Sequence, residues 1–90
     1  MNFGWDEEKA KVNLEKHRVS FDEAETVFDD PLCVTFYDPE HSYDEHRYIT
    51  VGESHRGRLL LVSYTGRGNK LRLISARKAT PAEREIYEEG

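Results

Sequence analysis

The side chains in this sequence that suit chemistry on a phosphodiester bond are arginines and a few groups that transfer protons. RNA cleavage without a metal ion needs a base for the 2′-hydroxyl, cations for the charge that builds on the phosphoryl oxygens, and an acid for the leaving oxygen. Arginine suits the second role, because its planar guanidinium holds two phosphate oxygens and remains charged. The candidate arginines are Arg47, Arg58, Arg72 and Arg77. The groups that could move protons are Lys16, His17 and Tyr87.

Each proton-transfer candidate, and Arg77, also has a structural interpretation. His17 could cap the carbonyls at the end of a helix, which imidazoles and cations favour. Lys16 could be a solvated lysine, and Arg77 could anchor a strand to a carboxylate on the following helix. Tyr87 could be an aromatic residue of the core. The types and spacing of these residues leave both interpretations open.

The distribution of charge along the chain supports a phosphate-binding surface although the net charge is −5. Residues 1–46 hold thirteen acidic and four basic residues, a net of −9. Residues 47–80 hold eight basic residues and one acidic residue, a net of +7. Separation of this kind predicts a cationic face on an acidic body, and such a face attracts phosphate whatever the total charge. The basic residues that we expect to bind RNA phosphates are Arg47, Lys70, Arg72 and Lys78.

A metal site is the rival interpretation of the polar segment between the second helix and the basic half. Its candidate ligands are Asp38, His41, Asp44 and His46, with His55 beyond them. Their spacing matches no zinc or calcium pattern, so we expect no metal. Glycines 66 and 68 precede a strand and not a helix, so they do not form a phosphate loop, and we expect no cofactor. Cys33 lies between Leu32 and Val34 and is predicted to be a small buried apolar residue.

Ninety residues form one domain, over 1–90. No apolar run approaches the ~20 residues of a membrane span, and no basic-then-apolar signal peptide begins the chain. We therefore expect a cytoplasmic protein without membrane contact.

The expected elements that position these groups form an α+β domain. Helices are predicted over 7–16, from the Ser20–Glu23 capping box to Asp30-Pro31, and over 81–88 after Thr80. Strands are predicted over 32–37, 47–51, 58–65 and 70–76, the last two joined by a hairpin loop at 66–69. This order predicts two N-terminal helices, a four-stranded antiparallel sheet with helices on one side, and a C-terminal helix.

Two motifs then give the sequence a family resemblance: F-x-W-D…N-x-x-K-H over residues 3–17 and R-L-I-S-A-R-K-A over residues 72–79. With matching residues in between, the chain resembles the BrnT toxin family over nearly its whole length. The resemblance implies a RelE-like fold and a ribonuclease toxin of a type II toxin–antitoxin system that cleaves free RNA. It also implies a BrnA-type antitoxin, a ribbon-helix-helix protein that neutralises the toxin and represses the shared operon, so that operator DNA is contacted only through the antitoxin complex. The family commonly has glycine at the position of Arg18, which would suit a left-handed helix cap, so Arg18 implies either strain or a different turn.

The residues and the resemblance together predict a metal-independent endoribonuclease that acts by 2′-hydroxyl attack and inhibits growth. Arg58, Arg72 and Arg77 would neutralise charge, Lys16 or His17 would move protons, and Tyr87 would position the substrate. The alternative is a non-catalytic module that binds an antitoxin or serves as corepressor, because a carboxylate-binding surface uses the same arginines.

Overall fold

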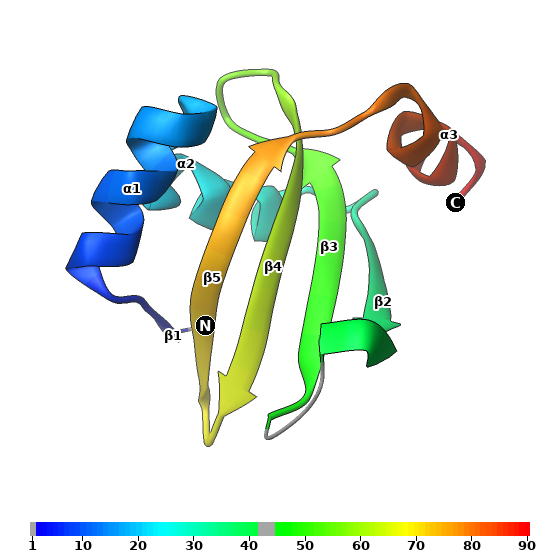
Figure 1. Cartoon of the computed structure of the whole chain (residues 1–90). Coiled ribbons are helices and arrows are strands. Elements are labelled where there is room, and N and C mark those ends of the chain that lie inside the picture. The colour runs from blue at the N-terminus through cyan, green and yellow to red at the C-terminus, as the bar shows by residue number, and fades with distance from the viewer. Residues whose placement is uncertain (1, 42–44) are drawn as a thin grey trace.

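The fold is a mixed sheet with helices on both faces, as given by a computed structural model that describes residues 2–41 and 45–90. The five strands are β1 (Asn2–Gly4), β2 (Val34–Asp38), β3 (Arg47–Glu53), β4 (Leu59–Arg67) and β5 (Lys70–Lys78). The helices are α1 (Glu7–His17), α2 (Phe21–Glu25), α3 (Pro81–Glu89) and the 3-10 turns η1 (Thr26–Asp29) and η2 (Pro39–His41). The strand order is β1-β5-β4-β3-β2 (Figure 1). None of the described helices is both long and apolar enough to cross a membrane.

The predicted α+β class and the order of the long elements are confirmed, and each predicted strand end lies within two residues of the observed one. The four-stranded antiparallel sheet is wrong, because β1 adds a fifth strand parallel to β5. Three residues are too few to show an alternating pattern, and β1 exists because the edge of β5 offers it partners. The second helix is also shorter than predicted, since α2 ends at Glu25 and continues as η1.

Side-chain caps start the helices. The Asp6 carboxylate accepts from the backbone N–H of Glu8 at 2.8 Å, and the Thr80 capping box is complete. At α2 only half of the predicted box forms: the Ser20 hydroxyl accepts from Glu23 N at 3.0 Å, whereas the Glu23 carboxylate is directed to Arg58. A basic partner far along the chain has replaced the local backbone donor.

The main core lies between one face of the sheet and α1, α2 and η1, which lie to the left of and behind the sheet in Figure 1. Its buried members are Val19, Phe21, Ala24, Val27, Leu60, Val62, Tyr64, Leu73 and Ala76. Gly52 allows η1 to approach β3 closely, since a Cβ there would lie 2.9 Å from Val27 Cγ1.

The prediction that all helices lie on one side of the sheet is wrong for α3. Tyr87 of α3 packs on Val51, Leu59 and Leu61, which alternate along their strands with the residues of the main core. Because neighbouring strand residues point to opposite faces, α3 covers the second face. Among the described residues, α3 packs against one end of that face.

Candidate active site

The register of the sheet arranges the second face, here called the open face, in three rows across β2, β3, β4 and β5. The row farthest from α3 is Asp38, Arg47, Thr65 and Arg72. The middle row is Phe36, Ile49, Ser63 and Ser75. The row that α3 covers in part is Val34, Val51, Leu61 and Arg77. Three of the four candidate arginines, Arg47, Arg72 and Arg77, therefore lie on one face.

A β-bulge in β5 is what brings Arg72 and Arg77 to the same face. The two residues are five positions apart, and a regular strand would direct them to opposite faces. The pairing shifts at this point, because Ser63 pairs with Ser75 and Tyr64 with Leu73, which leaves Ile74 as an extra residue. One inserted residue reverses the alternation beyond it, so Ser75 and Arg77 join Arg72 on the open face.

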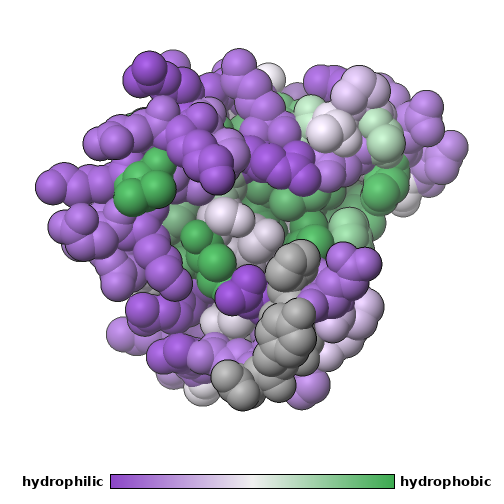
Figure 2. Space-filling model, in the orientation of Figure 1, coloured by the Kyte–Doolittle hydropathy of each residue, from purple (hydrophilic) through white to green (hydrophobic). Residues whose placement is uncertain are grey.

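A cavity of about 470 Å³ is hollowed in the open face beside α3. Its charged lining consists of Arg47 and Arg77 together with two acidic residues, Asp38 and Glu83. Ser63 and Ser75 also line it, and its apolar side includes Phe36 and Ile86. Figure 2 shows hydrophobic surface that runs from the middle of this face to α3, surrounded by hydrophilic side chains. Arg72 lies two rows from Arg77, about 13 Å along the strand, and does not line the cavity.

A second hollow of about 310 Å³ lies between α1 and β5 and contains the two predicted proton-transfer groups. Lys16 and His17 line it together with Val12, Ile74 and Ser75. Lys16 is exposed and His17 is half-buried. Ser75 lines both hollows, so the hollow at α1 that contains Lys16 and His17 adjoins the cavity that contains Arg77.

Asn13 holds α1 against β5 and so fixes this juxtaposition. Its buried amide nitrogen donates to the carbonyls of Val19 and Ala76, both at 2.9 Å, and its amide oxygen accepts from Ala76 N at 3.1 Å. In the sequence Asn13 stood out only as part of the N-x-x-K-H motif, and this role was not predicted. An amide at a position whose helical neighbours face the core was the available signal, since a buried amide must find hydrogen-bond partners.

Arg77 has the structural partner that one sequence interpretation predicted. Its Nη1 and Nη2 donate to the two carboxylate oxygens of Glu83 on α3 at 2.7 and 2.8 Å, and Nη1 also donates to the Lys78 carbonyl at 3.3 Å. The hydrogen bonds from Arg77 lower the pKa of Glu83, and those to Glu83 raise the pKa of Arg77. Among the described residues these bonds use three of the five guanidinium N–H donors, so two remain for a ligand in the cavity.

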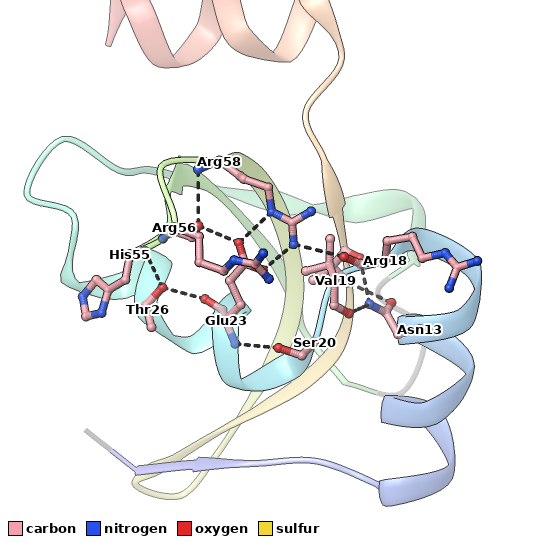
Figure 3. Close-up of polar contacts among 11 residues, drawn as sticks. Asn13, Arg18, Val19, Ser20, Glu23, Thr26, His55, Arg56 and Arg58 are labelled. Atoms are coloured by element: carbon pink, nitrogen blue, oxygen red, sulfur yellow. Dashed lines mark hydrogen bonds and ion pairs between the residues drawn. The ribbon is translucent and has the colours of Figure 1, made fainter.

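Arg58 does not join the other arginines. Its Nε donates to Glu23 Oε2 at 2.9 Å and its Nη2 to the Arg18 carbonyl at 3.0 Å, on the side of the sheet that α2 covers (Figure 3). Ser54 Oγ donates to the same Glu23 oxygen at 2.7 Å. The hydrogen bond from Arg58 lowers the pKa of Glu23 despite the burial of that carboxyl. These contacts give Arg58 a structural role between β4 and the turn from α1 to α2.

The turn that Arg58 holds contains a left-handed residue. Arg18 adopts φ 59° and ψ 32° and ends α1, so of the two outcomes left open by the sequence, the strained cap forms and not a different turn. A side chain in this region costs about 1–2 kcal/mol. The Arg58 bond to the Arg18 carbonyl and the Asn13 bond to the Val19 carbonyl keep the turn in place.

Tyr87 is likewise held by a partner away from the cavity. Its hydroxyl donates to Asp30 Oδ2 at 2.7 Å, and this bond raises the pKa of Tyr87 to about 12. Burial acts to raise the pKa of Asp30, but the backbone N–H groups of Glu53 and Leu32 and the Tyr87 hydroxyl together lower it. Tyr87 thus ties α3 to the segment between η1 and β2.

The two predicted phosphate-binding lysines, Lys70 and Lys78, do not lie beside the cavity on the open face. Lys78 pairs with Leu60, a residue of the main core, so it belongs to the face opposite Arg77. Lys70 is exposed beside the hairpin, opposite Arg67. The hairpin loop is Gly68-Asn69, shorter than predicted, and Gly68 has the positive φ of 62° that suits the first turn residue.

Of the candidate ligands of the rival metal site, the structure describes the side chains of Asp38, His46 and His55. His46 Nδ1 is 3.1 Å from the Tyr37 hydroxyl, and His55 Nε2 is 3.4 Å from Asp29 Oδ2. Asp44 and the His41 side chain lie outside the described residues. Within the described part of the chain, no three His, Cys, Asp or Glu side chains are arranged to hold a metal ion. Cys33 is half-buried, and burial raises the pKa of its thiol.

Comparisons with known proteins agree with the resemblance in the sequence. Residues 5–83 match the family described as "Ribonuclease toxin, BrnT, of type II toxin-antitoxin system". The structure is similar to the 1.1 Å crystal structure of the Brucella abortus ribonuclease toxin BrnT, with 25% sequence identity and a TM-score of 0.65. The similarity covers 89% of this chain and 97% of the Brucella chain. A comparison with curated proteins finds no match.

Proposed function

Because the chain belongs to the BrnT family of ribonuclease toxins of type II toxin–antitoxin systems, we propose that it is a metal-independent endoribonuclease whose active site is the open face of the sheet. It cuts RNA in the cytoplasm by attack of a 2′-hydroxyl on the adjacent phosphate. The bond to the 5′-oxygen breaks, and a 2′,3′-cyclic phosphate and a free 5′-hydroxyl remain. Cleavage of cellular RNA inhibits growth.

The observation that carries this function is the position of Ser75 between two groups of side chains. On one side are Lys16 and His17, and on the other is Arg77. Lys16 and His17 carry the two proton transfers: one takes the proton of the 2′-hydroxyl and the other protonates the leaving oxygen. Arg77 faces the phosphate between them and stabilises the charge that builds on its oxygens in the transition state.

Arg47 and Arg72 extend the cationic surface along the open face. Arg47 lines the same cavity as Arg77, and Arg72 lies in the same row as Arg47. These side chains bind the phosphates that flank the cut, which are bound equally in the ground state and in the transition state. We therefore assign them to RNA binding, and Lys70 to the outer end of that surface. Arg58 and Tyr87 are assigned structural roles, because both are held by buried or half-buried carboxylates.

The protein partner of a type II toxin is its antitoxin, and we propose a BrnA-type ribbon-helix-helix protein. The arginines Arg47, Arg72 and Arg77 on the open face favour an acidic segment that covers this face and so blocks RNA. DNA is contacted through the antitoxin in the complex of the two proteins.

The test is cleavage of a defined RNA by purified Arg77→Ala protein in EDTA. Removal of one donor to a transition-state anion lowers the rate constant by about 100- to 1,000-fold. Arg84→Ala is the matched control, since it removes an exposed arginine from α3 and leaves the cavity intact. A folded Arg77→Ala protein that cuts at the wild-type rate would contradict the role of this residue. Loss of wild-type activity in EDTA would contradict the metal-independent reaction.

One observation favours a second function, a non-catalytic module that binds an antitoxin or acts as corepressor. Arg77 already holds the carboxylate of Glu83 in the cavity, so the open face suits an acidic side chain of a partner. Growth arrest on expression without the neighbouring antitoxin supports the toxin. Normal growth combined with tight antitoxin binding supports the module.

A further inference from the structure

The cavity on the open face has an apolar side that phosphate chemistry does not use. Phe36 on β2, Ile49 on β3 and Ile86 on α3 line it. Phe36 is 36% exposed and Ile86 is 41% exposed, and both are among the large apolar residues left uncovered by the fold. Apolar surface beside the guanidinium groups of Arg47 and Arg77, which share the lining with Asp38 and Glu83, matches a ligand with one flat apolar part and one anionic part.

The middle row of the open face relates this apolar side to the candidate active site. It runs from Phe36 through Ile49 and Ser63 to Ser75, one residue on each strand. Three strand spacings separate its ends, about 14 Å from Cα to Cα. A nucleotide spans most of this distance, and Phe36 and Arg77 line the same cavity.

Along the row the side chains change from apolar to hydroxyl-bearing to cationic, which is the order that would suit the base, the sugar and the phosphate of one nucleotide. Phe36 and Ile49 offer flat and apolar surface, on which a base stacks. Ser63 and Ser75 offer hydroxyls, which suit the sugar. Arg77, diagonal to Ser63 and next to Ser75 on the same face, offers the cation.

We infer that Phe36, Ile49 and Ile86 form a subsite for one unpaired base, which makes single-stranded RNA the substrate class. The inference rests on the proposed function, because the phosphate of that nucleotide is the one directed to Arg77. A base within a duplex is stacked and paired and offers no free face to Phe36. The subsite holds a base by stacking and selects strandedness more than base identity.

The test is binding of an unstructured, fully 2′-O-methylated RNA oligonucleotide, which lacks the nucleophile and is not cut. Fluorescence anisotropy gives its dissociation constant as a single strand and after annealing to its complement. Wild-type protein binds the single strand more tightly than the duplex. Phe36→Ala weakens single-strand binding about fivefold to a hundredfold, in the range that aromatic stacking supports, and leaves duplex binding unchanged.

Tyr37→Ala is the matched control. Tyr37 is the next residue on β2, is 44% exposed and packs on Tyr48 on the opposite face. Its removal leaves single-strand binding at the wild-type value. Phe36→Trp restores binding and adds a spectroscopic signal, because a stacked base quenches the new indole fluorescence.

Equal single-strand affinity of Phe36→Ala and wild type overturns the subsite, as does an equal loss of single-strand and duplex binding. Absence of single-strand binding by the wild type overturns it as well. These outcomes are distinct from failure of the proposed function. If binding depends on Phe36 but unmodified RNA is not cut, the base subsite is supported and the proposed nuclease activity is contradicted. If RNA is cut but binding does not depend on Phe36, the nuclease activity is supported and the base subsite is contradicted.

Discussion

Replacement of Arg58 by alanine separates the structural interpretation of this residue from the catalytic one. In the wild type, Arg58 neutralises the carboxylate of Glu23 and binds the carbonyl of the strained residue Arg18. The side chain of Glu23 is 5% exposed and that of Arg58 is 23% exposed. Alanine at position 58 therefore leaves a carboxylate that water barely reaches, with Ser54 as its closest remaining donor.

The expected loss follows from this burial. Removal of one partner of a buried ion pair costs about 3–5 kcal/mol in free energy of unfolding. Because solvent reaches part of Arg58 and weakens the pair, we expect the lower end, about 3 kcal/mol. A domain of this size has about 5–13 kcal/mol in total. The corresponding fall in melting temperature is about 12–24 °C.

Urea denaturation followed by circular dichroism measures the loss, with Arg56→Ala as the matched control. Arg56 also faces Glu23, at 3.8 Å, but its side chain is 74% exposed. We expect this control to lose at most about 0.5 kcal/mol. Cleavage assays on both variants, at a temperature at which each is folded, should give the wild-type rate.

The difference in stability between Arg58→Ala and wild type should also shrink in acid. The Arg58 hydrogen bond lowers the pKa of Glu23 from its ordinary value of 4.5. A lowered pKa means that this contribution is complete above pH 4.5 and disappears as the pH falls through the lowered pKa. Two results would refute the reasoning: unchanged stability of Arg58→Ala at neutral pH, or a folded Arg58→Ala protein that cuts RNA as poorly as Arg77→Ala.

Two further substitutions test the turn and the last helix. Arg18→Gly should raise the free energy of unfolding by about 0.5–1 kcal/mol, because glycine adopts the left-handed cap without strain although it gains freedom in the unfolded chain. A lower free energy of unfolding in urea titrations would show instead that the Arg18 side chain makes stabilising contacts. Tyr87→Phe removes the hydrogen bond to Asp30 and should cost about 1.5–3 kcal/mol, with the cleavage rate per folded molecule unchanged. A stable Tyr87→Phe protein with little activity would return Tyr87 to the catalytic group.

Local signals predicted much of this fold. The caps at Asp6, Ser20 and Thr80 and the proline after Asp30 are local features, since the groups that they satisfy lie within a few residues. The long strands alternate or are continuously apolar, so their ends were predicted to within two residues. The strand β1 was missed because its stability comes from pairing with β5, 68 residues away in the register of Asn2 with Lys70.

The sequence predicted the types of residue in the candidate site better than it predicted which individual residues lie there. Arg47, Arg72 and Arg77 share a face as expected, but through a bulge at Ile74 that no turn or glycine marks. Arg58 looks equivalent to them in the sequence and differs because Glu23, 35 residues earlier, lies within reach of its guanidinium. Asn13 was missed as the residue that holds Lys16 and His17 near Ser75.

The sequence by itself determined the family, the order of the long elements and the cationic character of residues 47–80, because each of these depends on residue types and on neighbours along the chain. Which arginine lines the cavity on the open face and which one holds a buried carboxylate was decided only by the tertiary structure. The physical reason is that a guanidinium binds phosphate and carboxylate with the same geometry. Its role therefore depends on which anion the folded chain brings to it.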